Sequence, residues 1–313
     1  MLPILTVTLN PALDVTTHVA QLKPRQKLRC DRPVTHAGGG GVNVSRAIKI
    51  LGGESIAFIA LGGHTGAQYA ELLRRSRLNT EIWPLTEETR TSLTVMEETS
   101  GMPYRFVLPG PTISPAEAAA ILAHLARIIA SYRGFVVASG SLAPGVPEQF
   151  YAALAARVRA LGAKLIIDSH GAPLRAAASE RPYLIRLNHL EAQELVGGDA
   201  DRAARSLARD LVEGGYTETA IVSVGERGAI LSTSQGQLEI RPPRVEMRSG
   251  VGAGDSFVGA LAFALASGWS VEDAARYGVA AAASAVTTEA TELCRRADVE
   301  AFYAQMAAST ELA

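Results

Sequence analysis

The sequence predicts an α/β protein in which helices cover both faces of a mainly parallel central sheet. Two observations support this prediction: short β-rich runs alternate with longer helical patterns along the 313 residues, and several of these runs are continuously apolar. Such alternation is typical of βαβ units, and a continuously apolar strand indicates burial on both faces. A hydrophobic content of 48% and a charged content of 19% allow one large core, alone or with a small appended domain.

The elements follow one another in a regular order. Seven β-rich runs predict central strands at residues 4–9, 55–61, 135–139, 164–168, 183–187, 220–224 and 229–232, and a further strand-like segment covers 238–247. Helical patterns lie at residues 42–51, 66–75, 115–131, 147–161, 200–213, 254–266, 271–287 and 298–308. Because ligands of such sheets bind beyond the carboxyl ends of the strands, we expect a site in the loops there.

Two segments interrupt this order. Residues 14–34 are polar, rich in Lys and Arg and without helical periodicity, and residues 90–107 alternate as a strand does, with a turn at 100–103. Together they predict a small separate sheet, which could serve as a lid, as a dimer interface or only as a surface hairpin. We therefore expect a main domain of residues 1–10, 36–88 and 109–313, and a small β domain of residues 11–35 and 89–108.

Charge and composition narrow the classes of partner and compartment. The formal net charge of −1 gives no general attraction to nucleic acid or to anionic membranes. No apolar run approaches the roughly 20 residues of a membrane span, and the N-terminus lacks a basic signal region. Cys30 and Cys294 lack metal-ligand spacing, so we expect no disulfide framework or zinc site, and a reducing cytoplasm as the compartment.

The most informative motif is Gly252-Ala253-Gly254-Asp255, which opens an alanine-rich helical pattern. A helix start presents unpaired N–H groups and a partial positive charge, so it attracts anions such as phosphate. The small residues allow an anion to approach the backbone closely. Asp255 either stabilises the helix start or acts as a base beside a phosphoryl group, and the motif alone leaves both open.

A second glycine-rich segment, residues 38–41, leads into a helix that carries Asn43 in its first turn. Such a backbone can touch a ligand directly, and Asn43 offers both donors and an acceptor. A flexible hinge is the alternative; a Walker A loop is excluded because no Gly-Lys-Ser/Thr follows. Asp14, just after the first strand, can accept hydrogen bonds from sugar hydroxyls or be an ordinary turn residue.

Basic residues gather in the two segments of the small sheet. Arginines match phosphate oxygens in a two-pronged geometry, so convergence there would suit a phosphorylated substrate. The alternative for each of them is a solvated surface charge. These residues are Lys27, Arg29, Arg90 and Arg105.

Two further motifs follow predicted strands. Asn188 and Glu191 begin a helix, where they can either hold a hydrated Mg²⁺ or form a capping box. Ser223, Gly225 and Gly228 lie in a strand-to-turn segment. This segment either admits a nucleotide or is a plain hairpin turn.

In this order the motifs resemble those of the PfkB (ribokinase-like) carbohydrate kinases over essentially the whole chain. Within that family the chain is most similar to the PfkB-type 6-phosphofructokinases, through residues 27–30, the glycine loop and residues 104–110. Relatives that act on fructose 1-phosphate or tagatose 6-phosphate tend to carry lysine where this chain has Gly40. The shared motifs are Thr8-Leu9-Asn10-Pro11 with Asp14, Gly38 to Gly41 with Asn43, Ser139-Gly140-Ser141-Leu142, Asn188/Glu191, Ser223/Gly225/Gly228 and Gly252 to Asp255.

The resemblance implies an ATP- and Mg²⁺-dependent transfer to the 1-hydroxyl of fructose 6-phosphate, with Asp255 as general base and the small sheet as lid and homodimer interface. The N–H groups of Gly252, Ala253, Gly254 and Asp255 would stabilise the transferring phosphoryl group. Glu191 would organise Mg²⁺ through water. The other implied contacts are Asp14, Gly39, Gly40 and Asn43 for the sugar, Lys27, Arg90, Arg105 and Ser139 around its phosphate, and Arg186, Asn188, Ser223, Gly225 and Gly228 for the nucleotide.

Three departures from the family pattern leave other activities open. Arg186 stands where lysine is frequent, Gly250 where threonine is common, and residues 287–292 lack the Asn, Gly and Arg of a monovalent-cation site. A tagatose-6-phosphate kinase or a 1-phosphofructokinase is the alternative within the family. A non-catalytic sugar-phosphate sensor and a nicotinamide-dependent oxidoreductase are alternatives from other classes, although no dinucleotide fingerprint follows the first strand.

Overall fold

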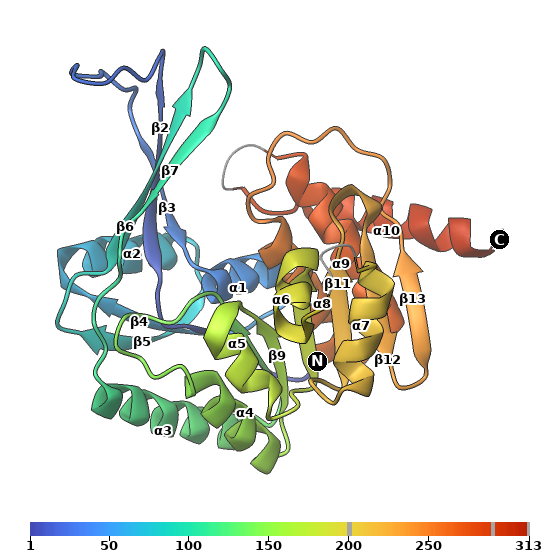
Figure 1. The fold of residues 1–313 in the computed structure, drawn as a ribbon. Coiled ribbons are helices and arrows are strands. Elements are labelled where there is room, and N and C mark those ends of the chain that lie inside the picture. The colour runs from blue at the N-terminus through green and yellow to red at the C-terminus, as the bar shows by residue number, and fades with distance from the viewer. Residues whose placement is uncertain (199–201, 289–291, 312–313) are drawn as a thin grey trace.

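The computed structural model describes residues 1–198, 202–288 and 292–311. Over these residues the chain forms a nine-stranded sheet and a separate four-stranded sheet (Figure 1). Neighbouring strands of the large sheet are parallel, except that the two strands at one edge join in antiparallel fashion. Its strands, in spatial order, are β13 (Gly236–Ile240), β12 (Ala229–Thr233), β11 (Thr219–Ser223), β10 (Leu184–Asn188), β9 (Lys164–Asp168), β8 (Phe135–Ser139), β1 (Ile4–Thr8), β4 (Ile56–Gly62) and β5 (Asn79–Leu85).

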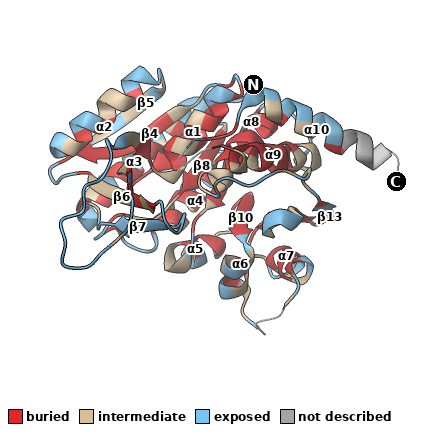
Figure 2. Cartoon of the chain, turned by 90° about the horizontal axis from the view of Figure 1, so that it is seen from above, coloured by how far each residue is buried: buried red, intermediate tan, exposed pale blue. Residues whose placement is uncertain are grey.

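Helices cover both faces of this sheet. One face packs on α3 (Pro115–Tyr132), α4 (Phe150–Ala160), α5 (Gly171–Ala178), α6 (His189–Val196) and α7 (Ala204–Glu213). The other face packs on α1 (Gly40–Ile50), α2 (Gly63–Arg75), α8 (Ala253–Ala266), α9 (Val271–Val286) and α10 (Arg296–Glu311). Successive residues of a strand point to opposite faces, so Leu5 joins the first core and Ile4 the second. Figure 2 shows the buried strands between the two helix layers.

The small sheet stands away from the main sheet (Figure 1). Its order is β3 (Val34–Gly38), β2 (Ala12–Val19), β6 (Arg90–Glu97) and β7 (Pro103–Val107). The strand β3 ends at Gly38, inside the segment that the sequence assigned to the main domain. This connection places the glycine loop directly at the junction between the two sheets.

The predicted fold class is confirmed, and each of the seven predicted central strands is present, two with the predicted bounds and the others with ends shifted by one residue. The segment 238–247 is a strand only as far as Ile240, because Pro242 and Pro243 have no N–H groups with which to extend the ladder. Two elements were missed: the edge strand β5, which contains Pro84, and the short helix α5. The predicted helix at 200–213 begins at Ala204, and its first two positions lie outside the described residues.

Among the described helices, none has the combination of length and apolar character that a membrane crossing requires.

Candidate active site

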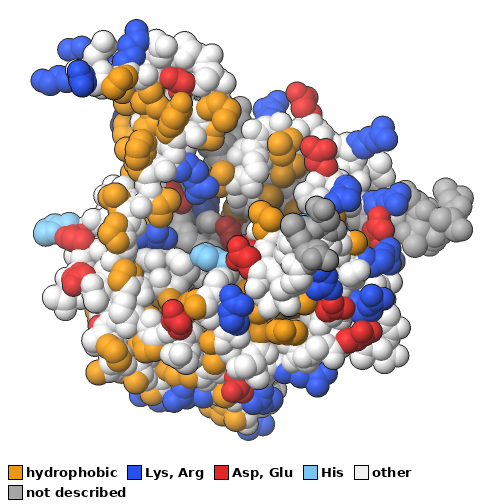
Figure 3. All heavy atoms as spheres, viewed as in Figure 1, with side chains coloured by type: hydrophobic (Ala, Val, Ile, Leu, Met, Phe, Trp, Pro, Cys, Tyr) orange, Lys and Arg blue, Asp and Glu red, His pale blue; other side chains and the backbone are white. Residues whose placement is uncertain are grey.

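The candidate site lies where the carboxyl ends of the central strands meet the start of two helices. Ser139, Asp168 and Ser223 end the strands β8, β9 and β11. The glycine loop begins α1, and Gly252 begins α8. Figure 3 shows the surface hollowed between the small sheet and the main domain, with basic, acidic and histidine side chains at the base of the hollow.

Asp255 lies in the first turn of α8 and contacts α1. Gly252 is the N-cap in a left-handed conformation (φ 78°), and no side chain caps the helix, so its first N–H groups remain available to an anion. The Asn43 Nδ2 group donates to Asp255 Oδ2 over 2.9 Å. Gly259 allows this approach of the two helices, because a Cβ there would lie 2.6 Å from the Cβ of Ala47 on α1.

The environment of Asp255 favours its neutral form. Burial, and to a smaller extent the nearby Asp168 carboxylate, raise the pKa of Asp255 to about 6. The hydrogen bond from Asn43 and the positive charges of Arg186 and Arg46 oppose this rise. The result is a carboxylate with a pKa close to neutrality, which is a property of general bases.

Asp168 organises the strand ends beside Asp255. Its carboxylate accepts from Arg186 Nη1 at 3.1 Å and from Ser139 Oγ at 3.4 Å. Arg186 also donates from Nε to Ser223 Oγ at 3.2 Å. The sequence predicted Ser139, Arg186 and Ser223 but missed Asp168. Its position at the carboxyl end of an apolar strand was the available signal.

The glycine loop packs closely against the end of β8. A Cβ at Gly40 would lie 2.2 Å from Ser139 Oγ, so any side chain there requires the neighbouring groups to move. Gly39, the N-cap of α1, has a φ of 130°, a conformation that L side chains rarely adopt. The loop therefore brings its backbone directly to the site.

Asp14 lies at the base of the small sheet among basic side chains. Burial raises the pKa of Asp14 to about 6, opposed by the charges of Arg105, Arg90 and Arg46. Arg90 donates to the Asn10 carbonyl at 3.1 Å. The structure thus brings three of the predicted substrate-binding residues together.

Lys27 is not part of this group. It lies in the exposed connection between β2 and β3, and its ammonium has no ion-pair partner among the described residues. Arg29 lies in the same connection. The sequence assigned Lys27 to the substrate phosphate, but among the described residues of one chain Lys27 forms no ion pair with the other predicted site residues.

The predicted nucleotide and metal residues lie on β10, at the start of α6, and at the end of β11 with the loop that follows it. Asn188 Oδ1 accepts from the Glu191 N–H at 2.9 Å, while Glu191 Oε2 accepts from the Asn188 N–H at 2.8 Å, which forms a capping box. Asn188 and Glu191 therefore form the capping box that the sequence analysis left open as the alternative to a Mg²⁺ site. The described residues contain no group of three or more His, Cys, Asp or Glu side chains that could hold a metal.

The two loop glycines differ in what surrounds them. Gly225 has a φ of 61° and open space on its Cβ side. A Cβ at Gly228 would instead lie 2.0 Å from the Ile240 carbonyl oxygen. Packing against β13 is thus sufficient to explain Gly228, whereas the space beside Gly225 is free for a ligand.

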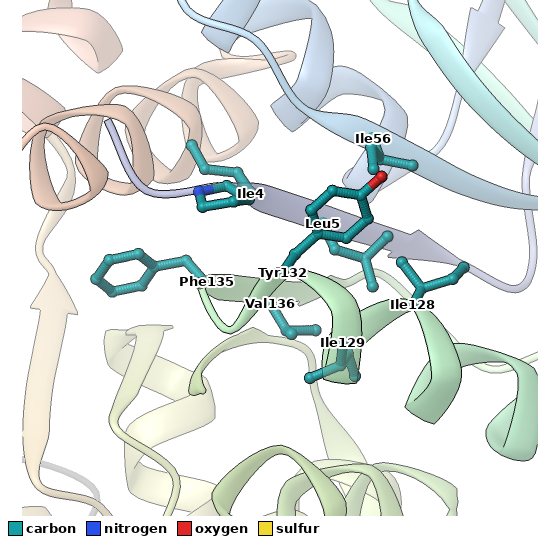
Figure 4. A pocket seen from close by; sticks show the side chains of 10 residues that line it. Ile4, Leu5, Ile56, Ile128, Ile129, Tyr132, Phe135 and Val136 are labelled. Atoms are coloured by element: carbon teal, nitrogen blue, oxygen red, sulfur yellow. The ribbon is translucent and has the colours of Figure 1, made fainter. Parts of the chain in front are cut away.

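An apolar pocket elsewhere has a different character. Its lining comes mainly from the amino ends of β1 and β8 and from the end of α3 (Figure 4). The strands of a parallel sheet have their carboxyl ends at the opposite edge, where Ser139 and Asp168 lie. Ile4, Ile128 and Phe135 line this pocket, and we assign it no role in the site.

Comparison with known proteins relates this arrangement to a single family of enzymes. The model of the pfkB family carbohydrate kinases matches residues 8–298. ATP-dependent 6-phosphofructokinase isozyme 2 of Mycobacterium tuberculosis is 39% identical over 311 residues, 99% of this chain and 91% of the relative. The isozyme 2 of Escherichia coli is 37% identical, over 98% of this chain and 99% of the relative. A 1-phosphofructokinase of Xanthomonas campestris is 33% identical over 83% of each chain.

Solved structures agree with this relation. Phosphofructokinase-2 of Escherichia coli, in complex with potassium, superimposes with a TM-score of 0.92 and 36% identity, covering 98% of this chain and 100% of its own. The same enzyme in complex with fructose 6-phosphate gives a TM-score of 0.90. A ribokinase of Thermotoga maritima, only 20% identical, shares the fold with a TM-score of 0.80. The chain therefore belongs to the pfkB family of carbohydrate kinases, as its motifs predicted.

Proposed function

We propose that the protein transfers the γ-phosphoryl group of ATP to the 1-hydroxyl of fructose 6-phosphate, with Asp255 as general base. The observation that supports this most directly is the arrangement around Asp255. Its carboxylate lies at the uncapped start of α8 and is held by Asn43 from the glycine-loop helix. A base and an anion-stabilising backbone are thus side by side, which is what phosphoryl transfer to a hydroxyl requires.

The sugar contacts follow from the same geometry. Asn43, Asp14 and the loop backbone at Gly39 border the site and offer both donors and acceptors to sugar hydroxyls. Arg90 and Arg105 approach Asp14 from the small sheet and supply positive charge for the 6-phosphate. Ser139 would complete these contacts from the main sheet.

The choice of fructose 6-phosphate rests on Gly40 and on the relatives. Gly40 packs against Ser139 without space for a side chain, whereas relatives that act on fructose 1-phosphate tend to carry lysine there. The two 6-phosphofructokinase relatives above are also more similar to this chain than the 1-phosphofructokinase is. Since the family includes both activities, 1-phosphofructokinase and tagatose-6-phosphate kinase are the competing functions.

The residues present fit ATP with Mg²⁺. The uncapped start of α8 and the open space beside Gly225 and Gly250 can accept phosphate groups. Glu191 uses Oε2 in the capping box, and we assign its carboxylate to Mg²⁺ through water, because Mg²⁺ usually keeps several waters. When bound, the ion supplies positive charge to the phosphates. Arg186 and Asn188 border this region and would lie beside the nucleotide.

We also propose that the small sheet forms a homodimer with a second copy of the chain. Its register places Tyr104 and Phe106 on the face that also carries Leu93, opposite the face of Asp14 and Arg105. Tyr104 is 43% exposed and Phe106 is 50% exposed, so the part of this apolar face that β7 carries is uncovered within one chain. One of the solved relatives is a tetrameric, inhibited form of the Escherichia coli phosphofructokinase-2, so oligomers occur among close relatives.

The test is a panel of fructose 6-phosphate, fructose 1-phosphate, tagatose 6-phosphate and free fructose, assayed for ADP release with Mg²⁺. We expect the highest kcat/KM with fructose 6-phosphate. A preference for one of the other sugar phosphates would replace the substrate and keep the kinase. Ligand binding without any ADP release would instead support a non-catalytic sensor.

A further inference from the structure

Arg46 is a charged residue that the motifs above do not assign. It lies on α1 one turn after Asn43, and its side chain is only partly exposed. Arg46 Nη1 donates to Asn43 Oδ1 at 3.1 Å, and more weakly to the Ala37 carbonyl at 3.5 Å. The guanidinium is thus directed back along the helix toward the site.

The hydrogen bonds determine how the Asn43 amide is oriented. Arginine has donors only and an ionised carboxylate has acceptors only, so an amide between them must turn its oxygen to the arginine and its NH₂ to the carboxylate. Asn43 satisfies this condition, with Arg46 on its oxygen and Asp255 Oδ2 at 2.9 Å from Nδ2. The three side chains form one hydrogen-bonded line.

The positive charge of the Arg46 guanidinium interacts with both carboxylates of the site, Asp255 and Asp14. Burial lowers the pKa of Arg46, while Tyr69, Asp255 and Asp14 raise it, so its charge interacts with both site carboxylates. It lowers the pKa of Asp255 and of Asp14 in return. No other described arginine both contacts Asn43 and acts on these two carboxylates.

We propose that Arg46 is a positioning residue for the reaction: it fixes the Asn43 amide in the orientation that holds the Asp255 carboxylate. Its charge also keeps both site carboxylates more readily ionised than burial alone would allow. This proposal rests on the proposed role of Asp255. Arg46 itself acts through Asn43 and through its field, and we assign it no contact with the reacting atoms.

The first experiment compares Arg46→Met and Arg46→Lys with the wild type on the sugar phosphate that the wild type uses. Methionine keeps much of the side-chain volume but removes the charge and the donors. We expect Arg46→Met to lower kcat about 10- to 100-fold through misplacement of the base, with the KM for ATP unchanged. Lysine retains a charge and a donor and should recover a large part of kcat. The matched control is Arg74→Met on the surface of α2, which should leave kcat unchanged.

A second readout separates positioning from a merely structural role. Without the guanidinium, the acid limb of the kcat profile should move to higher pH by about 1 unit, because a positive charge near Asp255 is lost. The groups that face Asp255 are Asp168 and Arg186, in addition to Asn43 and Arg46. The groups that interact with Arg46 from other elements are Tyr69, Asp14, Asp255 and His36. His36 is present in both the wild type and Arg46→Met. Loss of the positive Arg46 raises the pKa of His36, and the positive charge that His36 then gains would oppose the expected rise in the pKa of Asp255.

A double-mutant cycle tests the route through Asn43. If Arg46 acts through the amide, Arg46→Met in an Asn43→Ala background should lower kcat much less than in the wild type. Additive effects would overturn the route through Asn43. An unchanged kcat and acid limb in Arg46→Met would overturn the proposal as a whole, as would a loss explained entirely by unfolded enzyme.

Failure of the role proposed for Arg46 can be distinguished from failure of the proposed kinase function. If the wild type turns over none of the sugar phosphates, the kinase assignment fails, and ¹³C NMR titration of the Asp255 carboxyl still tests the electrostatic part. That resonance, identified by its loss in Asp255→Asn, should titrate at higher pH in Arg46→Met than in the wild type. Identical titrations would overturn the role of Arg46 independently of any activity.

Discussion

Two carboxyl groups of the site, Asp14 and Asp255, are held in environments that disfavour their charge. Burial is the largest cause for both, and basic neighbours only partly compensate for it. A carboxylate with a pKa of about 6 is a stronger base than a solvated one, so it accepts a hydroxyl proton more readily in the transition state. The same property makes it a cost to folding at neutral pH.

Asp255→Asn separates these two consequences. The amide cannot accept the hydroxyl proton, so we expect kcat to fall about 10²- to 10⁴-fold while ATP still binds. The rate of ADP release measures kcat, and calorimetry measures ATP binding by the same variant. A near-normal kcat would remove Asp255 from the reaction.

The same variant should be more stable than the wild type at neutral pH. The pKa of Asp255 rises from 3.8 to about 6 on folding, so its contribution to stability is fully present below 3.8 and is lost as the pH rises through 6. Replacing the carboxylate should stabilise the protein by about 1–3 kcal/mol at about pH 8. Urea unfolding at about pH 8 and about pH 4 measures the difference, which should shrink at the lower pH. An equal or lower stability at about pH 8 would contradict the buried charge.

Activity should depend on pH in the opposite sense. If Asp255 is the base, as proposed, its protonation below about 6 removes that base. Protonation of Asp14 in the same range would weaken the hydrogen bonds that we propose it accepts from sugar hydroxyls. We therefore expect kcat to fall with a limb near pH 6, and kcat/KM for the sugar phosphate to fall more steeply because both groups affect it. Steady-state rates across this range provide the test. A flat kcat profile down to about pH 4.5 would show that no group with a pKa near 6 is needed.

Among the elements, the contact between α1 and α8 sets the site. The two helices approach closely at Gly259, where a Cβ would meet Ala47 and the Val44 carbonyl. This brings Asn43 beside Asp255, although the two are 212 positions apart in the sequence. The helix α8 is apolar on all sides and lies between α1 and α9, so packing fixes the direction of its amino end.

The loop after β11 gives a matched pair of substitutions. Gly228→Ala places a Cβ 2.0 Å from the Ile240 oxygen at a φ of 93°, so we expect a loss of about 2–5 kcal/mol in stability. Gly225→Ala meets no neighbour, so it should cost only about 1 kcal/mol of backbone strain. The second variant should raise the KM for ATP if the nucleotide lies beside Gly225. Denaturant unfolding with ATP kinetics of both variants tests this, and equal losses of stability would contradict the packing argument.

For the whole molecule, we propose that a second copy of the chain completes the small sheet. Its strand β7 is exposed throughout, and Lys27 lies in an exposed connection that reaches no other site residue within the chain. An isolated sheet with an apolar face is a poor structure in water, so a second copy would stabilise it. In the proposed dimer, lid closure and assembly would depend on the same strands.

Phe106→Glu tests the dimer. A charge at the centre of the apolar face should convert a dimer into a monomer, with a raised KM for the sugar phosphate because the lid loses its support. Ile82→Glu, at a similarly exposed apolar position on the edge strand β5 of the main sheet, is the control and should remain dimeric. Light scattering after size-exclusion chromatography reports both masses. A wild type that is monomeric, or a dimeric Phe106→Glu, would exclude this interface.

The central strands, most helices and the family could be predicted from the sequence, because they depend on local patterns. Continuous apolar runs identify buried strands wherever they lie, and short motifs such as Gly252 to Asp255 carry their chemistry in consecutive residues. The edge strand β5 and the helix α5 were not predicted, because both segments contain proline and consist largely of polar or small residues. Such elements are held by tertiary contacts more than by their own propensity.

Which side chains meet depends on how the whole chain packs, and local patterns do not predict it. In the sequence, Asp168 is only the last residue of an apolar strand. In the structure its carboxylate accepts hydrogen bonds from Arg186 and Ser139 and raises the pKa of Asp255. The line from Arg46 through Asn43 to Asp255 depends on two helices far apart in the chain. Hydrogen bonds and pKa shifts fall off within a few ångströms, and distance in space is set by packing of the whole chain rather than by order along it.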